Sequence, residues 1–253
     1  MGLLDNGIPI RKLSIIGSHS SMSTGTWGDA FQTQANSLTA QMKMGMRALD
    51  IRCRHYNNAF PIHDRLVYLN VDFADVLQTV QSFLAAYPTE TILMHVVEEY
   101  SPSGNSRTFE QTFLSYQGSY PNLFWNPTSQ NPVLGSVRGK IVLIQDFTGA
   151  IHGLLYSTFT VLPHKWYNTN WDQYDKWTAV KSFLKSTNNA GVSCLSFWTG
   201  HGGSFPYFVA SGKSSPGTSD PRLATGLTTP GFSSSYPDFP RVACFIGICT
   251  IAF

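Results

Sequence analysis

The chain has 253 residues, of which 42% are hydrophobic and 13% are charged, and its formal net charge is +2. This apolar share is sufficient for a buried core and excludes a disordered, solvated chain. The small net charge and the lack of any Lys/Arg run exclude a typical nucleic-acid-binding protein, and no apolar run reaches the ~18 residues of a membrane-spanning helix.

Short apolar runs recur along the chain and predict buried strands. The runs are LSII (13–16), ALDI (48–51), AFPIH (59–63), TILMHVV (91–97), KIVLIQ (140–145), CLSFW (194–198) and RVACFIGI (241–248). Because they are almost continuously apolar, they favour strands of a sheet that is covered on both faces.

Helical patterns lie between these strands. Over residues 72–87 the apolar side chains recur at helical spacing, with Asp72 as the expected N-cap and Pro88 as the residue that ends the helix. Weaker patterns predict helices over 106–116 and 172–185. Two segments rich in Ser, Gly, Pro and Asn, 101–136 and 203–238, are predicted to be long surface loops.

Strands that alternate with helices over this length predict an α/β fold, specifically a distorted, single-domain TIM-like (β/α)8 barrel over residues 1–253. We find no internal repeat, linker or block of charge that would divide the chain. No two cysteines are spaced as a C-x-x-C pair, which argues against a zinc site, and all four are expected to be buried thiols. They are Cys53, Cys194, Cys244 and Cys249.

In such a barrel the chemistry lies at the carboxyl ends of the strands, so the polar residues that follow the apolar runs are candidate site residues. They include His19, Asp50, Arg52, Arg54, His63, Asp64, Glu98, Glu99, Gln145 and Asp146. The remaining histidines have no comparable context and are interpreted as structural. These are His55, His95, His152, His164 and His201.

Two histidines and one arginine at one rim have a clear chemical use. Cleavage of a phosphodiester by an internal hydroxyl needs a base for that proton, an acid for the leaving oxygen and a cation for the phosphate. His19, His63 and Arg52 supply these three parts without a metal. The residues alone leave another interpretation open, in which Asp50 and Arg52 form a structural ion pair and His63 is an ordinary loop residue.

Five segments carry a more specific signal through their order and spacing. They are LSIIGSHSSMST (13–24), RALDIRCR (47–54), the stretch from FPIHD to VVEEY (60–100), GSVRGKIVLIQDF (135–147) and LSFWTGHGGSFPYFVAS (195–211). Together, over about residues 9–248, they resemble the X-domain superfamily of phosphatidylinositol-specific phospholipase C. The resemblance is closest to the bacterial, calcium-independent branch.

This resemblance implies roles for several residues. His19 resembles the base for the inositol 2-hydroxyl, His63 the acid for the diacylglycerol oxygen, and Arg52 the phosphate-binding cation, with Asp50 in the same catalytic set. Arg52 stands where metal-dependent relatives carry acidic ligands, so no metal and no cofactor is expected. The expected substrate-binding residues are Glu98, Asp172, Tyr174 and Trp198, and Trp198 is also expected in an aromatic rim with Phe205 and Tyr207.

The chain departs from the family pattern at four places. Ser20 and Ile248 stand where relatives carry aspartates that support the arginine and the first histidine. Glu98–Glu99 replaces a lysine–glutamate pair, and Gln145–Asp146 replaces a lysine–arginine pair. These changes remove supporting carboxylates and substrate-side cations, although Asp29 or Asp64 is a possible replacement acid.

Three functions are therefore distinguished. The first is metal-independent cleavage of an inositol phospholipid or a related phosphodiester. The alternative is a degraded barrel that binds a polyol, sugar or lipid headgroup without turnover. The third, a metal-dependent relative such as a glycerophosphodiesterase or sphingomyelinase, would need an acidic trio near His19.

The partners expected from the resemblance are a phospholipid or another inositol-containing phosphodiester and the surface of a membrane, not nucleic acid. A secreted or membrane-peripheral location is favoured, although no signal-peptide pattern opens the chain. The oligomeric state and the compartment are left open.

Overall fold

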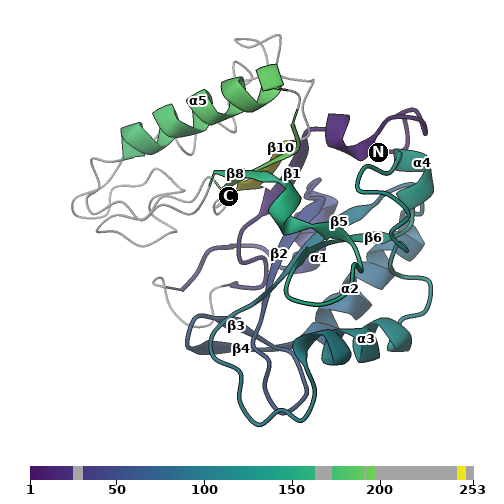
Figure 1. Ribbon diagram of the computed structural model, residues 1–253, viewed down its shortest axis with the longest axis vertical. Coiled ribbons are helices and arrows are strands. Elements are labelled where there is room, and N and C mark those ends of the chain that lie inside the picture. Colours follow the sequence, from purple (N-terminus) through teal and green to yellow (C-terminus); the bar gives the residue numbers. More distant parts are fainter. Residues whose placement is uncertain (25–30, 163–172, 191, 198–243, 249–253) are drawn as a thin grey trace. The chain divides into compact units, whose positions relative to one another are not determined.

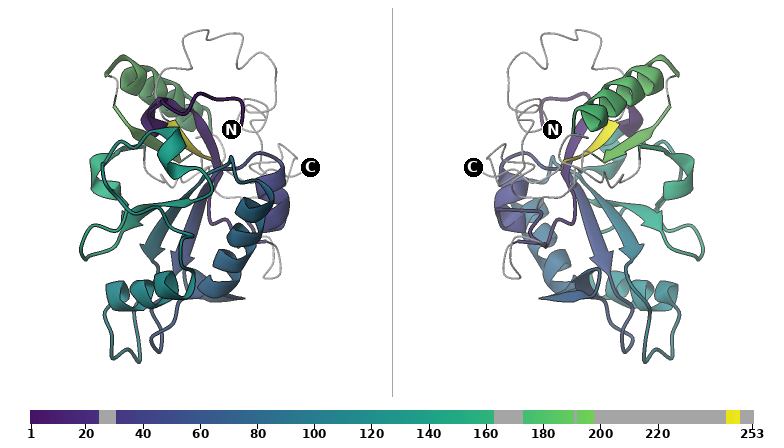
Figure 2. Two further views of the ribbon diagram at one scale, coloured as in Figure 1. Left: turned by 90° about the vertical axis from the view of Figure 1, so that its right-hand side faces the viewer. Right: turned by 90° about the vertical axis from the view of Figure 1, so that its left-hand side faces the viewer.

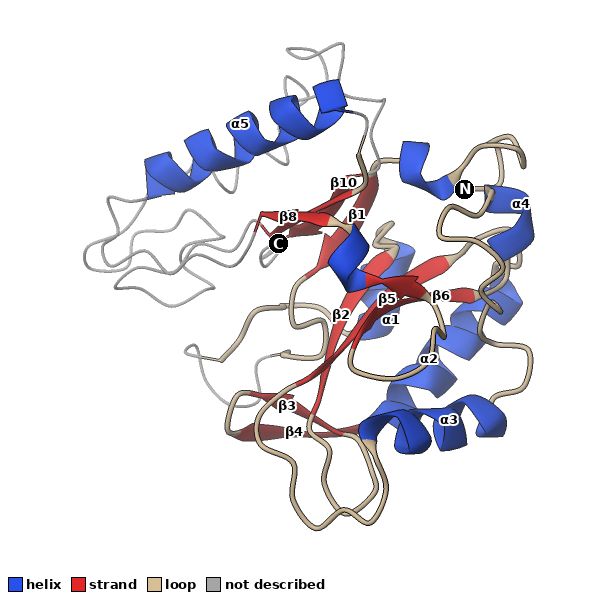
Figure 3. Cartoon of the chain, viewed as in Figure 1, coloured by secondary structure: helices blue, strands red, loops and turns tan. Residues whose placement is uncertain are grey.

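The fold was obtained as a computed structural model (Figures 1 and 3). It describes residues 1–24, 31–162, 173–190, 192–197 and 244–248, and for 173–177, 188–190 and 244–248 it describes the backbone. The chain divides into two compact units, Met1–Ile10 with Leu38–Thr158 and Arg11–Ser37 with Phe159–Phe253, which are described separately. A single domain over residues 1–253 stays a prediction.

Four parallel strands form the sheet of the first unit, in the order β7–β6–β5–β2. The strands are β2 (Ala48–Cys53), β5 (Ile92–Glu98), β6 (Ile141–Asp146) and β7 (Leu154–Leu155). The first three confirm strands that the apolar runs predicted. Their register pairs Asp50 with His95 and Val97 with Asp146, so the polar residues near their carboxyl ends come to one edge.

A hairpin extends this sheet at β2. It consists of β3 (Pro61–Asp64) and β4 (Val67–Asp72). β3 is antiparallel to β2, with Cys53 opposite Ile62, and β4 is antiparallel to β3. This corrects the expectation that 59–63 is one of the parallel barrel strands. The loops on either side of β3 are short, whereas a parallel crossover needs a dozen or more residues.

The first unit contains four α-helices and a final 3-10 turn. They are α1 (Leu38–Lys43), α2 (Phe73–Ala86), α3 (Phe109–Ser119), α4 (Leu134–Val137) and η2 (Tyr156–Thr158). α1 and α2 lie side by side on one face of the strands (Figure 2). α3 confirms the helical pattern over 106–116. The composition of 101–136 had predicted a long surface loop, and α3 shows that this segment is not entirely loop.

The start of α2 explains why this helix was predictable. The Asp72 carboxylate accepts a hydrogen bond from the Ala74 amide (3.0 Å), while Asp75 accepts one from the Asp72 amide (2.9 Å). This reciprocal capping satisfies amides that have no partner within the helix. The Tyr116 hydroxyl of α3 donates to the same Asp72 carboxylate (2.8 Å), so the cap also joins α2 to α3.

We expect Asp72→Ala to lower the free energy of unfolding by about 2–3 kcal/mol, because it removes the cap and the acceptor of the Tyr116 hydroxyl. Urea denaturation followed by circular dichroism measures this change. Thr108→Ala is the matched control, since Thr108 caps α3 in the same way by accepting from the Gln111 amide. An equal loss in both variants would contradict the joining role of Asp72.

In the described part of the second unit, four short parallel strands form a sheet in the order β1–β10–β9–β8. They are β1 (Ile15–Ser18), β8 (Thr160–Leu162), β9 (Cys194–Phe197) and β10 (Cys244–Ile248). Helix α5 (Gln173–Ala190) buries Val180 and Leu184, and η1 (Ile10–Lys12) precedes β1. Strands β1, β9 and β10 and helix α5 were predicted, whereas the very short β7 and β8 were not.

The cysteine prediction is confirmed where the structure describes the side chains, because Cys53 and Cys194 are buried, reduced thiols. The side chains of Cys244 and Cys249 lie outside the described residues, as does the predicted loop 203–238. Within the described part of the chain, no helix combines the length and apolar character needed to cross a membrane.

Candidate active site

The Arg52 guanidinium is held by two carboxylates. Its Nε donates to Asp50 Oδ2 (3.2 Å), and its Nη1 donates to Glu99 Oε2 (3.1 Å). Asp50 and Arg52 are two residues apart on β2 and therefore share a face of the strand. Burial lowers the pKa of Arg52, but Asp50, Glu99 and, more weakly, Asp64 together raise it above its usual value. The strand therefore presents a fixed positive charge.

The other oxygen of Asp50 contacts a histidine that the sequence did not single out. His95 Nδ1 lies 2.9 Å from Asp50 Oδ1, and His95 Nε2 lies 3.2 Å from Asp146 Oδ2. The imidazole stacks on the ring of Tyr156, with 4.9 Å between centroids and 20° between planes. Burial opposes the charged form, but the two carboxylates outweigh it and raise the pKa of His95.

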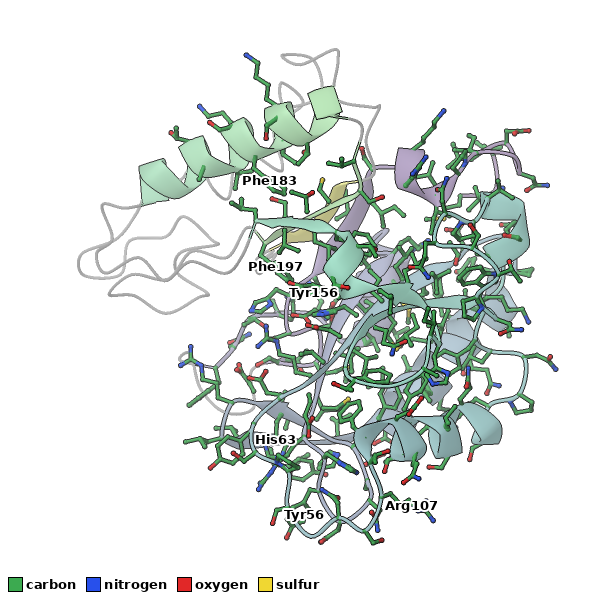
Figure 4. All side chains as sticks on the ribbon, viewed as in Figure 1. Tyr56, His63, Arg107, Tyr156, Phe183 and Phe197 are labelled. Atoms are coloured by element: carbon green, nitrogen blue, oxygen red, sulfur yellow. The ribbon has the colours of Figure 1, made fainter. Side chains whose placement is uncertain are left out.

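His63 lies on the hairpin beside β2, where Figure 4 labels it. β2 and β3 are antiparallel, with Cys53 opposite Ile62. Arg52 precedes Cys53 and His63 follows Ile62, so Arg52 and His63 lie beside this pair on neighbouring strands. His63 Nδ1 lies 3.4 Å from the Arg65 carbonyl, which can only accept, so Nδ1 carries a proton and Nε2 is the nitrogen that titrates. Burial, opposed by the Arg65 carbonyl and assisted by Arg54, lowers the pKa of His63.

His19 lies directly after β1, in the second unit. Its backbone carbonyl accepts hydrogen bonds from Gln34 Nε2 (2.8 Å) and Thr33 Oγ1 (3.1 Å), and its ring meets Phe197 edge to face at 6.0 Å. These contacts fix the loop that carries the histidine. Its role as a base for a site at Arg52 stays a prediction, because His19 and Arg52 belong to different units.

Several predicted site residues lie outside the described part of the structure. Asp172 and Trp198 are among them, with Asp29, Phe205 and Tyr207. Tyr174 lies in α5, where only the backbone is described, and the backbone of Ile248 is paired with Ser18. The predictions for these side chains are therefore unchanged.

Comparison with known proteins decides the family. Residues 7–146 match the family "Phosphatidylinositol-specific phospholipase C, X domain". The chain belongs to the phosphatidylinositol-specific phospholipase C X-domain family. The 1-phosphatidylinositol phosphodiesterase of Staphylococcus aureus (strain Newman) is 35% identical over 161 residues, which are 59% of this chain and 51% of that protein. The enzyme of the same name from Listeria monocytogenes is 31% identical over 157 residues, 58% of this chain and 48% of that protein.

The chain thus aligns with about half the length of these curated relatives. Solved structures match over more of the chain. A phosphatidylinositol-specific phospholipase C from S. aureus is similar at TM-score 0.76 and 25% identity, covering 99% of this chain and 90% of that one. The L. monocytogenes structure gives 0.75 at 22% identity, covering 98% and 92%. These neighbours confirm the predicted α/β fold class, a TIM-like barrel.

Glu98 and Glu99 are adjacent at the end of β5 and point in opposite directions. Successive side chains of a strand point to opposite faces, so Glu98 is directed away from the face that carries His95. Burial raises the pKa of Glu98, whereas Glu99 pairs with Arg52 and accepts from the Arg65 amide (3.2 Å). Glu99 therefore contributes to the X-domain site, and substrate binding by Glu98 stays a prediction.

Gln145 and Asp146, at the end of β6, also point in opposite directions. Gln145 is buried and holds the following loop: its Nε2 donates to the Ala150 carbonyl (2.9 Å), and its Oε1 accepts from the His152 amide (2.9 Å). Asp146, the partner of His95, is more exposed. Glu99 and Asp146 are thus paired with Arg52 and His95 of the same site and do not form an unopposed negative rim.

The residues of this candidate site that sequence reasoning missed are His95, which was interpreted as structural, and Tyr156, whereas Glu99 was among the candidates. His95 lies inside an apolar run, and only the register of β2, β5 and β6 brings it between two carboxylates. The signal in the sequence that could have indicated the role of His95 was the acidic residue near the end of each neighbouring strand. Within the described ranges, no group of three or more His, Cys, Asp or Glu side chains is arranged to hold a metal.

Proposed function

We propose that this protein cleaves the phosphodiester of an inositol phospholipid, or of a closely related phosphodiester, without a catalytic metal. The observation that carries the proposal is the Arg52 guanidinium, partly buried and fixed by Asp50 and Glu99 at the end of β2. The X-domain match and the 1-phosphatidylinositol phosphodiesterases among the relatives support the same substrate class.

Arg52 is proposed to bind the phosphate. A guanidinium is planar, always charged and able to contact two non-bridging oxygens at once. Because Asp50 and Glu99 hold Arg52 before substrate arrives, little reorganisation is needed as negative charge develops on those oxygens. A permanent cation here supplies charge that a metal ion would otherwise supply.

His63 is proposed as the general acid and His19 as the general base. The inositol 2-hydroxyl transfers its proton to His19 and attacks phosphorus, forming a cyclic phosphate. The bond between phosphorus and the diacylglycerol oxygen breaks, and that oxygen takes the proton from His63 Nε2. The Arg65 carbonyl supports this role of His63, because it accepts from Nδ1 and leaves Nε2 to exchange the proton.

The alternative is a binding module without turnover. One observation favours it: Arg52 and His95 are already paired with Glu99, Asp50 and Asp146, so an anionic phosphate competes with carboxylates of the protein. Asp172, Tyr174, Glu98 and Trp198 are proposed to contact the headgroup in either case. The two functions differ in turnover, which is directly measurable.

The test uses vesicles of phosphatidylinositol or of phosphatidylcholine, with EDTA or with Ca²⁺, and measures the release of water-soluble phosphate. We expect release from phosphatidylinositol alone, at equal rates with EDTA and Ca²⁺, because the choline headgroup of phosphatidylcholine has no free hydroxyl that can attack the phosphorus. Release that depends on Ca²⁺ would indicate a metal-dependent enzyme. Binding to phosphatidylinositol vesicles without release would favour the binding module.

A further inference from the structure

The Asp50–His95–Asp146 cluster has a geometry that a neutral histidine does not satisfy. Both ring nitrogens of His95 lie within hydrogen-bond distance of a carboxylate oxygen, at 2.9 Å and 3.2 Å. A neutral imidazole has one N–H and one lone pair, so one carboxylate would face a lone pair. The imidazolium has an N–H at each nitrogen and satisfies both contacts.

The cluster also determines the position of Arg52. Asp50 uses Oδ1 for His95 and Oδ2 for Arg52, so the histidine and the arginine hold opposite oxygens of one buried carboxylate. Removal of the imidazolium would leave Asp50 with one of these two bonds. The carboxylate would then be able to rotate, and one of the two carboxylates that orient the guanidinium, Asp50 beside Glu99, would no longer be fixed.

We propose that His95 is a positioning residue in its imidazolium form, which holds Asp50 between itself and Arg52 and so aligns the guanidinium. This inference deepens the proposed function and rests on it, because Arg52 is the group proposed to bind the phosphate. His95 does not contact the reacting atoms and acts through Asp50.

The groups around His95 come from each neighbouring element. Asp50 and Arg52 lie on β2, Asp146 lies on β6, and Tyr156 of η2 covers the ring. Burial, Asp146 and Asp50 raise the pKa of Tyr156 to about 12, so this hydroxyl stays neutral when His95 titrates. Loss of the His95 proton would therefore remove one of the positive charges that, within the described part of the chain, face Asp50, Asp146 and Glu99, and would leave that of Arg52.

The direction of the pH effect follows from this arrangement. The carboxylates raise the pKa of His95 in the folded protein, so the imidazolium persists above the usual pKa of a histidine. Its stabilising contribution is complete at low pH and disappears as the pH rises through the raised value. The alignment of Arg52 should disappear over the same range.

The experiment is NMR of the ¹⁵N-labelled full chain between pH 5 and pH 10. We expect His95 to remain protonated at pH 7 and to titrate above its usual value, and Asp146→Asn to lower that pKa. We also expect the Arg52 Nε–H to exchange with water about tenfold faster in His95→Gln than in the wild type. Glu110→Gln, which removes the carboxylate partner of His152, is the control and should change neither signal.

A neutral His95 at pH 7, or unchanged exchange at Arg52 in both His95→Gln and Asp146→Asn, would overturn the inference. Asp146 is the more exposed partner, so its variant should fold even where His95→Gln does not. Neither readout needs turnover. A protein that titrates as expected yet cleaves no phosphatidylinositol would contradict the proposed function while supporting the alignment of Arg52 by His95.

Discussion

Arg52→Lys is expected to lower kcat/KM for phosphatidylinositol by about 10²–10³-fold, a loss on the order of 3–4 kcal/mol of transition-state stabilisation. Lysine keeps the charge but presents a compact ammonium, which contacts one oxygen where the guanidinium contacts two. It also loses the planar fork that meets Asp50 and Glu99 together. Steady-state kinetics on phosphatidylinositol vesicles, with circular dichroism to confirm the fold, measures the loss.

Arg47→Lys is the matched control for this substitution. Arg47 is also largely buried and also pairs with a carboxylate, that of Glu90 (2.7 Å), but it contacts the carbonyls of Met42 and Met46 and not the candidate site. The control variant should lose stability and keep its kcat/KM. Equal kinetic losses in the two variants would mean that Arg52 acts on the fold and not on the phosphate.

His63→Gln is expected to lower kcat by about 10²–10⁴-fold, because the leaving oxygen would depart without a proton. Glutamine preserves most of the volume and one hydrogen-bond donor, so the hairpin should remain folded. A substrate with a good leaving group, such as a nitrophenyl ester of inositol phosphate, should recover much of the rate, because its leaving oxygen needs no proton.

His152→Gln is the control for this variant, since His152 is another poorly exposed histidine of the same unit and pairs with Glu110. It should retain activity on both substrates. If His63→Gln lost the two activities equally, His63 would serve the structure or binding and not protonation of the leaving oxygen.

The pH dependence offers an independent test of His63. Burial and the Arg54 charge lower its pKa, and a general acid must be protonated, so kcat/KM should decline as the pH rises through a value below that of an ordinary histidine. Arg54→Gln should move this decline to higher pH. An unmoved decline would show that another group controls it.

The elements that local signals specify were predictable from the sequence. α2 has a helical apolar pattern, the cap at Asp72 and Pro88 beyond its end, and each of these signals acts within a few residues. The apolar strands β2, β5 and β6 were equally clear. The antiparallel direction of β3 was not, because an apolar run specifies burial and leaves the choice of neighbouring strand to the whole fold.

The residues of the candidate site were likewise predictable only where a local signal in the sequence marked them. Arg52 was found because it follows an apolar strand and matches a family segment. His95 was missed because its partners are 45 and 51 residues away, and a shift of register by one residue would direct it to the opposite face. The choice between Glu98 and Glu99 likewise depends on strand phase, which adjacent identical residues do not reveal.

The most direct test of the central claim is phosphorus NMR of the wild-type protein incubated with phosphatidylinositol and an excess of EDTA. We expect the signal of a cyclic inositol phosphate to appear first, and to be absent with His19→Ala. Appearance of the acyclic phosphate as the first product would contradict attack by the inositol 2-hydroxyl. A reaction that stops with EDTA and resumes with added metal would contradict the assignment of the phosphate-binding charge to Arg52.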